Sequence, residues 1–235
     1  MCPKKTVATL KLNRMLSVYM KWIIDIFRTS VGKKFIIAFT GLFLVTFLLV
    51  HMFGNLLLLK NDGGVAFNAY GEALLSSLLM RTIEILLLFG FLVHIGLTIK
   101  VSIENKMARP TGYAMQKAVR GSTWFSRNMR HTGSIILIFL ILHLKSFFWD
   151  HRMMEAPGTM YDAVIYEFSN IYWVLFYVAS MGLLSFHLIH GVQSTFQSLG
   201  LRHEKYTIFI KIFGYLYALG VPLVFALIPI LIYKG

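Results

Sequence analysis

The chain has 235 residues, of which 57% are hydrophobic and 14% are charged, whereas a soluble domain carries about 25% charged residues. This composition, with a mean hydropathy of +0.68, indicates a membrane protein. The single cysteine, Cys2, excludes an intramolecular disulfide, a cysteine-ligated iron–sulfur cluster and a structural zinc site.

Residues 1–34 form a basic N-terminal segment. Apolar residues such as Met15 and Trp22 alternate there with charged residues such as Arg14 and Lys21, a pattern that suits a helix lying on a membrane surface. A disordered tail is the alternative for the first dozen residues. The segment lacks the apolar core and cleavage site of a secretory signal.

Five apolar segments follow, and each is expected to form a transmembrane helix, because a bilayer core about 30 Å thick needs roughly 20 helical residues. Strands of a membrane barrel are about half that length and alternate in polarity. The third segment is short and is expected to extend by a turn at each end. The sequence therefore predicts an all-α membrane protein with one five-helix domain over residues 35–232. The five segments are residues 35–59, 83–101, 133–148, 171–192 and 208–232.

The distribution of Lys and Arg predicts the orientation. Eighteen of these residues lie in the N-terminal segment and in the second and fourth loops, and five lie on the other side. The positive-inside rule then places the N-terminus in the cytoplasm and the C-terminus outside. The net charge of +13 is thus first a topology signal and second a surface for a cytoplasmic partner, and we expect no nucleic-acid partner.

Four histidines occur one each in the first four spans, at two depths. At 1.5 Å per residue, His51 and His143 lie roughly 24 and 15 Å from the inner ends of their spans. His94 and His187 lie roughly 10 and 8 Å from the inner ends of theirs. The first two are therefore expected in the outer half of the bilayer, and the other two in the inner half.

Metal ligation explains four such residues better than structural hydrogen bonds do. A single buried histidine is more often a contact between helices, but such bonds return only about 0.6 kcal/mol each. Two imidazoles on facing helices can hold a haem iron, and the site then transfers single electrons. Zinc fits poorly, because no carboxylate or thiolate accompanies the histidines. Two haems, each between two helices, are therefore predicted.

The other histidines leave alternatives open. His187 and His190 are three residues apart and share a helix face, so spacing alone does not choose between them as the ligand, and His190 could instead orient His187 or bind a haem propionate. His131, near Arg127 and Arg130, is expected at the interface near a propionate. His151 and His203 are expected in solvated loops. Small residues near the histidines are consistent with a flat macrocycle and equally with ordinary helix packing. These residues are Gly41, Gly54, Gly90, Gly182, Ser185 and Gly191.

Four motifs make a family resemblance specific: GLFLVTFLLVHMFGNL, FLVHIGLTIKVSIENKMARP, RNMRHTGSIILIFLILHLKSFFW and FHLIHGVQSTFQSLGL. In this order they resemble the single-chain, five-span cytochrome b membrane anchor of succinate:quinone oxidoreductases and fumarate reductases that holds two haems b. The resemblance covers residues 31 to about 232.

The resemblance implies that His51 and His143 hold the distal haem iron, and that His94 and His187 hold the proximal one. It favours His187 over His190 because the family's ligand precedes a glycine by four residues, as His187 precedes Gly191. It also implies a bacterial cytoplasmic membrane and two partner chains: a flavoprotein that performs the dicarboxylate chemistry, and an iron–sulfur protein docked on the basic inner face. The chain would be the quinone-reactive subunit of the enzyme, with menaquinone as the expected quinone.

A quinone site needs groups that exchange protons beside an apolar slot. Near the outer haem the candidates are Glu84, Arg81 and Glu72, with Asn55 and Tyr70 in addition. Glu84 is the only acid well inside a span, and its alternative role is an interfacial ion pair with Arg81.

Two other functions compete with the resemblance. The haem b subunit of a hydrogenase or formate dehydrogenase would also join a quinone to an iron–sulfur partner, but the presence of one histidine in each of spans one to four favours the succinate-type anchor. A proton-coupled transporter built on buried histidines would need more intramembrane acids than Glu84.

Overall fold

The computed structural model describes residues 14, 15, 17, 19, 21, 25, 27–108, 124–154, 157–201 and 203–235, except for the side chain of Arg152. Within this part the chain is helical and contains no strand. Most of residues 1–34, which carry the predicted surface helix, and residues 109–123 of the second basic loop fall outside the described residues.

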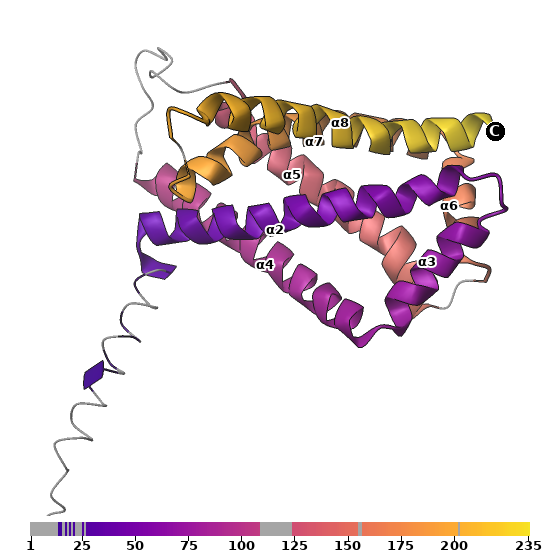
Figure 1. Cartoon of the computed structure of the whole chain (residues 1–235), viewed down its shortest axis with the longest axis horizontal. Coiled ribbons are helices and arrows are strands. Elements are labelled where there is room, and N and C mark those ends of the chain that lie inside the picture. Colours follow the sequence, from indigo (N-terminus) through magenta and orange to yellow (C-terminus); the bar gives the residue numbers. More distant parts are fainter. Residues whose placement is uncertain are drawn as a thin grey trace, which may run out of the picture.

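In the part of the chain that the structure describes, five helices are long and apolar enough to cross a membrane, which confirms the predicted number of spans and makes the chain a multi-pass membrane protein. They are α2 (Ser30–Leu56), α4 (Leu78–Met107), α5 (Trp124–Leu144), α7 (Ile171–Ser198) and α8 (Thr207–Lys234). Figure 1 shows them as one bundle of long helices running between two ends.

The third span is longer than expected. It begins at Trp124, more than two turns before residue 133, and continues through a π-helix, η2 (Lys145–Met153). The polar stretch from Ser126 to Ser134 lowered the apparent hydropathy of this region, yet the backbone is helical throughout it. His151, which was expected in a solvated loop, belongs to this π-helix, and its Nδ1 atom is buried.

Short helices gather at one end of the bundle, which we call the cap end (Figure 1). They are the 3₁₀ turn η1 (Leu57–Leu59), α3 (Val65–Ser76), η2 and α6 (Met160–Phe168). Neither α3 nor α6 was predicted from the sequence. The backbone N–H of Tyr161 in α6 donates to Oδ1 of Asn68 in α3, which joins the two short helices. The predicted orientation makes the cap end the outer one.

Helix α7 is the central element, because it packs against α2, α5 and α8, while α4 packs mainly against α2. Apolar side chains from η1, α6, α7 and α8 form a cluster at the cap end, which we call the cap cluster. A second cluster joins α2, α7 and α8 deeper in the bundle. The buried members of the cap cluster are Leu58, Val164, Phe168, Val174, Tyr177 and Ile228.

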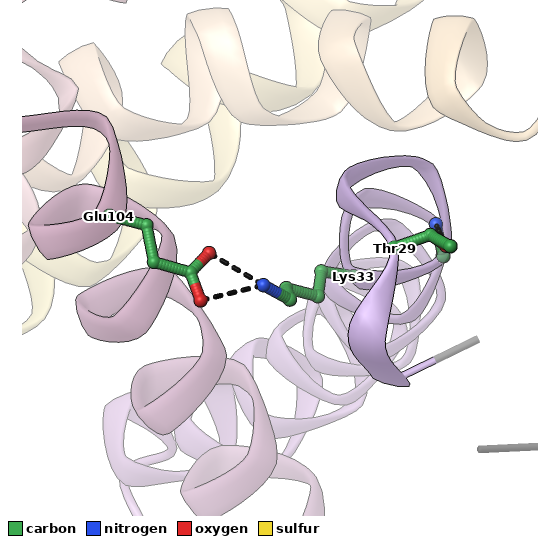
Figure 2. A network of polar contacts seen from close by, with 4 residues as sticks. Thr29, Lys33 and Glu104 are labelled. Atoms are coloured by element: carbon green, nitrogen blue, oxygen red, sulfur yellow. Dashed lines mark hydrogen bonds and ion pairs between the residues drawn. The ribbon is translucent and has the colours of Figure 1, made fainter. Parts of the chain in front are cut away.

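An ion pair joins α2 to α4 near the opposite end (Figure 2). Nζ of Lys33 lies 2.7 and 2.5 Å from the two carboxylate oxygens of Glu104. The Lys33 side chain is only 6% exposed, whereas that of Glu104 is 39% exposed. Lys33 was counted among the residues of the basic inner flank, but its charge is buried and paired rather than displayed to a partner.

Candidate functional site

The histidines predicted to share the outer layer lie side by side near the cap end. His51 is on α2, five residues before the helix ends, and His143 is at the end of α5. Their ring centroids are 6.0 Å apart, with the ring planes at 80°. Phenylalanines surround both rings: Phe47 stacks on His51, and Phe139 stacks on His143. We call these two histidines the cap-end pair.

A neighbouring helix holds His143. The Nδ1 atom of its ring lies 3.2 Å from the hydroxyl of Tyr177 on α7. Tyr177 is 8% exposed and belongs to the cap cluster. A partner at Nδ1 leaves Nε2 as the atom that can bind a metal.

Among the described polar contacts of His51, the only partner is Asn55, which lies on the same helix. The Asn55 amide donates to the His51 carbonyl at 2.8 Å, and the amide nitrogen also lies 3.3 and 3.4 Å from the two ring nitrogens. Because the two distances are nearly equal, this contact does not select one tautomer. Phe225 of α8 packs on the same ring, with centroids 5.6 Å apart.

In the second pair, His94 of α4 is held by α2. Its Nδ1 atom lies 3.2 Å from the Ile37 carbonyl and 3.2 Å from the Thr40 hydroxyl oxygen. A carbonyl can only accept, so Nδ1 carries the proton and donates it. The hydroxyl of Thr40 itself donates to the Ile36 carbonyl at 2.8 Å. The lone pair of Nε2 in His94 is therefore available.

His187 of α7 completes the second pair. It interacts electrostatically with His94, and its Nδ1 atom is buried with no hydrogen-bond partner in the described part of the chain. Two glycines adjoin these rings: a Cβ atom on Gly133 would lie 3.5 Å from Cε1 of His187, and one on Gly41 would lie 3.3 Å from Cε1 of His94. Gly41 therefore lies against the ring of His94 and not against that of His51, although His51 is nearer to it in the sequence.

These residues are the ones that could hold two bis-imidazole metal centres. A metal–imidazole bond of about 2.0–2.1 Å places a ring centroid about 3 Å from the metal, so two ligands on opposite sides have centroids about 6 Å apart. The cap-end pair, at 6.0 Å, has this spacing. In the second pair, the buried Nδ1 of His187 without a partner and the glycines beside both rings fit the same kind of group.

Other metal ligation has no support in the described residues. No group of three or more His, Cys, Asp or Glu side chains gathers there into a metal site. The donor set of each pair is two imidazoles with no nearby carboxylate, which suits a haem iron better than zinc.

The two additional haem-contact candidates are placed less centrally. His190 is partly buried on α7, and within the described contacts it interacts electrostatically with His187. His131 is exposed near the start of α5. The prediction that His187 is the ligand and that these two are accessory stays a prediction.

The candidate residues for a quinone site lie at three places: Arg81 and Glu84 on α4, Glu72 on α3, and Tyr70 with Asn55 near the cap end. Nη1 of Arg81 lies 4.0 Å from Oε2 of Glu84, so the expected pair exists. Glu84, Leu87, Phe91 and His94 follow one another at three- and four-residue spacing, which puts Glu84 on the same face of α4 as His94. Glu72 is exposed on α3.

Tyr70 and Asn55 lie next to the cap-end pair. The Tyr70 ring fits against Gly54, three residues after His51, where a Cβ atom would come within 2.6 Å of Cε1 of the tyrosine. Asn55 touches His51 directly. Five candidate residues named from depth and chemistry therefore occupy the cap-end half of α2, α3 and α4.

No protein-family model, curated protein sequence or solved structure matches this chain. The functional assignment therefore depends on the residues themselves and their geometry.

The polar contacts that hold two of the candidate histidines were not predicted from the sequence. His94 contacts the Thr40 hydroxyl and the Ile37 carbonyl, and His143 contacts the Tyr177 hydroxyl. These contacts join residues on different helices, so the spacing of residues along the sequence does not predict them. The one signal in the sequence is polarity, since Thr40 and Tyr177 are polar residues inside predicted spans.

Proposed function

We propose that this chain is a dihaem cytochrome b membrane anchor that passes electrons between a membrane quinone and the iron–sulfur subunit of a succinate:quinone oxidoreductase or fumarate reductase. The observation that supports it most directly is the cap-end pair, two imidazoles from different membrane-spanning helices with centroids 6.0 Å apart. The second candidate pair is His94 on α4 and His187 on α7.

The chain's own residues would perform three tasks. His51 with His143, and His94 with His187, would hold the two haem irons, which would supply one-electron chemistry. Tyr177 would hold the ring of His143 in one tautomer, and Thr40 and the Ile37 carbonyl would do the same for His94. Phe47, Phe139 and Phe225 would exclude water from the cap-end pair.

Haem content tests the proposal. Purified protein should show reduced-minus-oxidised absorption of b type with two haems per chain. His51→Ala and His143→Ala should each remove the same haem, while His94→Ala and His187→Ala should each remove the other. His203→Ala is the matched control, because His203 is exposed in the loop between α7 and α8, and it should keep both haems.

A colourless protein, or haem binding that survives all four ligand substitutions, would refute the proposal. The partner assignment needs a second measurement on the complex isolated from its native membrane. We expect a flavoprotein and an iron–sulfur protein to co-purify with the chain and the complex to reduce a menaquinone analogue with succinate. Co-purification with a hydrogenase or a formate dehydrogenase would instead place the same dihaem chain in another enzyme.

The quinone site is proposed at the cap-end part of α4, with Glu84 as the group that exchanges protons and Arg81 and Glu72 beside it. Positioned acid–base groups contribute roughly 100-fold or more to catalysis, so Glu84→Gln should lower the quinone-dependent kcat at least about tenfold. Both haems should remain. Glu204→Gln, in the exposed loop before α8, is the control and should keep wild-type kcat, and an equal kcat in both variants would exclude Glu84.

A further inference from the structure

The two pairs share an asymmetry: in each, one ring is held by a neighbouring helix. His143 is held by the Tyr177 hydroxyl and His94 by the Ile37 carbonyl and Thr40, all at 3.2 Å. In the described part of the chain, Nδ1 of His187 has no partner, and His51 has only Asn55 of its own helix. The partner at His94 includes a main-chain atom, whereas the partner at His143 is a single side chain.

Tyr177 is well placed to fix the His143 ring. It is 8% exposed, and its ring packs edge-on against Phe139 and Phe168, with centroids 5.0 and 4.9 Å away. These contacts confine the phenol, so its hydroxyl stays beside Nδ1 of His143. Within the described hydrogen bonds the hydroxyl has this imidazole nitrogen as its partner.

We propose that Tyr177 is a positioning residue for the cap-end metal centre, and that its hydroxyl oxygen accepts a hydrogen bond from Nδ1–H of His143 and thereby lowers the midpoint potential of one haem. The inference rests on the proposed function. An acceptor at Nδ1 makes the imidazole a stronger donor through Nε2. A stronger donor stabilises the oxidised iron relative to the reduced iron, so the potential falls.

The decisive variant is Tyr177→Phe, which removes only the hydroxyl and keeps the ring packing. A redox titration of the purified chain should show two haems, with one midpoint shifted to a more positive value and the other unchanged. In a His94→Ala background, which keeps only the cap-end haem, the same substitution should shift the remaining midpoint. In a His143→Ala background it should shift nothing.

Tyr217→Phe is the matched control. Tyr217 is also 8% exposed, and its hydroxyl donates to the Val45 carbonyl at 2.5 Å, so the variant likewise loses a buried hydroxyl and its hydrogen bond. It contacts neither pair in the described hydrogen bonds, and both midpoints should match those of the wild type. An equal shift in the two variants would overturn the proposal, as would an unchanged pair of midpoints in Tyr177→Phe.

A second variant covers the case in which Tyr177→Phe loses the haem. Tyr177→Gln offers a carbonyl oxygen to Nδ1 and should restore haem binding; if it fails as Phe does, a hydrogen bond is not what Tyr177 supplies and the proposal is wrong. A wild-type chain without haem would refute the proposed function itself. A wild-type chain with two haems whose potentials ignore Tyr177 would refute only this inference.

Discussion

A glycine on α2, Gly41, lies against the imidazole of His94. A Cβ atom there would lie 3.3 Å from Cε1 of His94 and 3.7 Å from the Thr195 hydroxyl oxygen. The absence of a side chain at Gly41 therefore leaves room for the His94 ring beside α2. The same ring is hydrogen-bonded to the carbonyl of Ile37, one turn before Gly41.

Gly41→Val should displace the His94 ring and remove one of the two haems, because a branched side chain is too large for the space beside the ring. Gly41→Ala should have a smaller effect, since the ring needs to move by only a few tenths of an ångström. The measurement is haem per chain from reduced-minus-oxidised spectra. Gly96→Val on α4 is the control, since nothing lies within 4 Å of a Cβ atom there. Equal haem loss in both valine variants would show a general effect on helix stability.

At the level of single residues, the sequence identified the histidines but not what holds them. Buried histidines stand out in apolar spans, and depth along a helix predicts which ones share a layer. The contacts of Tyr177 with His143 and of Thr40 with His94 depend on how helices are rotated about their axes, which packing determines. Likewise, Lys33 was counted as a flank charge, while its partner Glu104 lies 71 residues away in the chain.

At the scale of helices, the ion pair between Lys33 of α2 and Glu104 of α4 predicts that removing one partner costs more stability than removing the other. Glu104→Gln leaves the buried ammonium of Lys33 without a counter-charge, whereas Lys33→Met leaves a carboxylate that reaches water. Removing one partner of a buried pair costs about 3–5 kcal/mol, and the exposure of Glu104 reduces that cost. We therefore expect Glu104→Gln to lower Tm more than Lys33→Met does, as measured by circular dichroism in detergent.

The control for this comparison is Asp150→Asn. Asp150 pairs with Lys145 at 2.6 Å, but the two side chains are 42% and 63% exposed, and exposed pairs contribute little. Its Tm should stay close to that of the wild type. A larger drop for Lys33→Met than for Glu104→Gln would contradict the view that the buried lysine determines the cost.

The start of α6 predicts a pH dependence. The backbone N–H and the hydroxyl of Thr159 donate to the Asp162 carboxylate at 2.8 and 2.7 Å, and these bonds hold the pKa of Asp162 below its ordinary value of 3.8. A lowered pKa means that the folded helix favours the carboxylate. The stabilisation is thus complete above the ordinary pKa and is lost as the pH falls through the lowered one.

Asp162→Asn should accordingly speed hydrogen exchange in α6 relative to the wild type at neutral pH, because the capping box loses its charged acceptor. The difference should vanish once the pH is below the lowered pKa of Asp162. Exchange in α4, which does not contain this box, provides the reference within the same sample. A difference that persists at low pH would mean that the carboxylate charge is not involved.

The long elements were predictable and the short ones were not, for a physical reason. A span needs many consecutive apolar residues, so runs such as residues 35–59 are unmistakable. Helices α3 and α6 have 12 and 9 residues, and only their starts carry local signals. Gly64, with φ of 86°, precedes α3, and Thr159 with Asp162 forms the capping box of α6, a signal that was present in the sequence and was not used.

For the whole molecule, the orientation in the membrane is predicted from the distribution of Lys and Arg. It can be tested by cysteine labelling in a Cys2→Ser background. Ser169→Cys, exposed after α6, should react with an impermeant maleimide on right-side-out vesicles, whereas His203→Cys, exposed between α7 and α8, should react only after lysis. The opposite result would invert the topology and place the cap end in the cytoplasm.

The cap cluster bears on which molecules can reach the cap-end pair. Apolar side chains from η1, α6, α7 and α8 fill the space at this end, where Tyr177 contacts His143. These apolar side chains would disfavour the entry of dissolved ions and other hydrophilic molecules at this end. If the chain has the proposed function, we expect the reactant at the cap-end pair to be lipid-soluble, as a membrane quinone is.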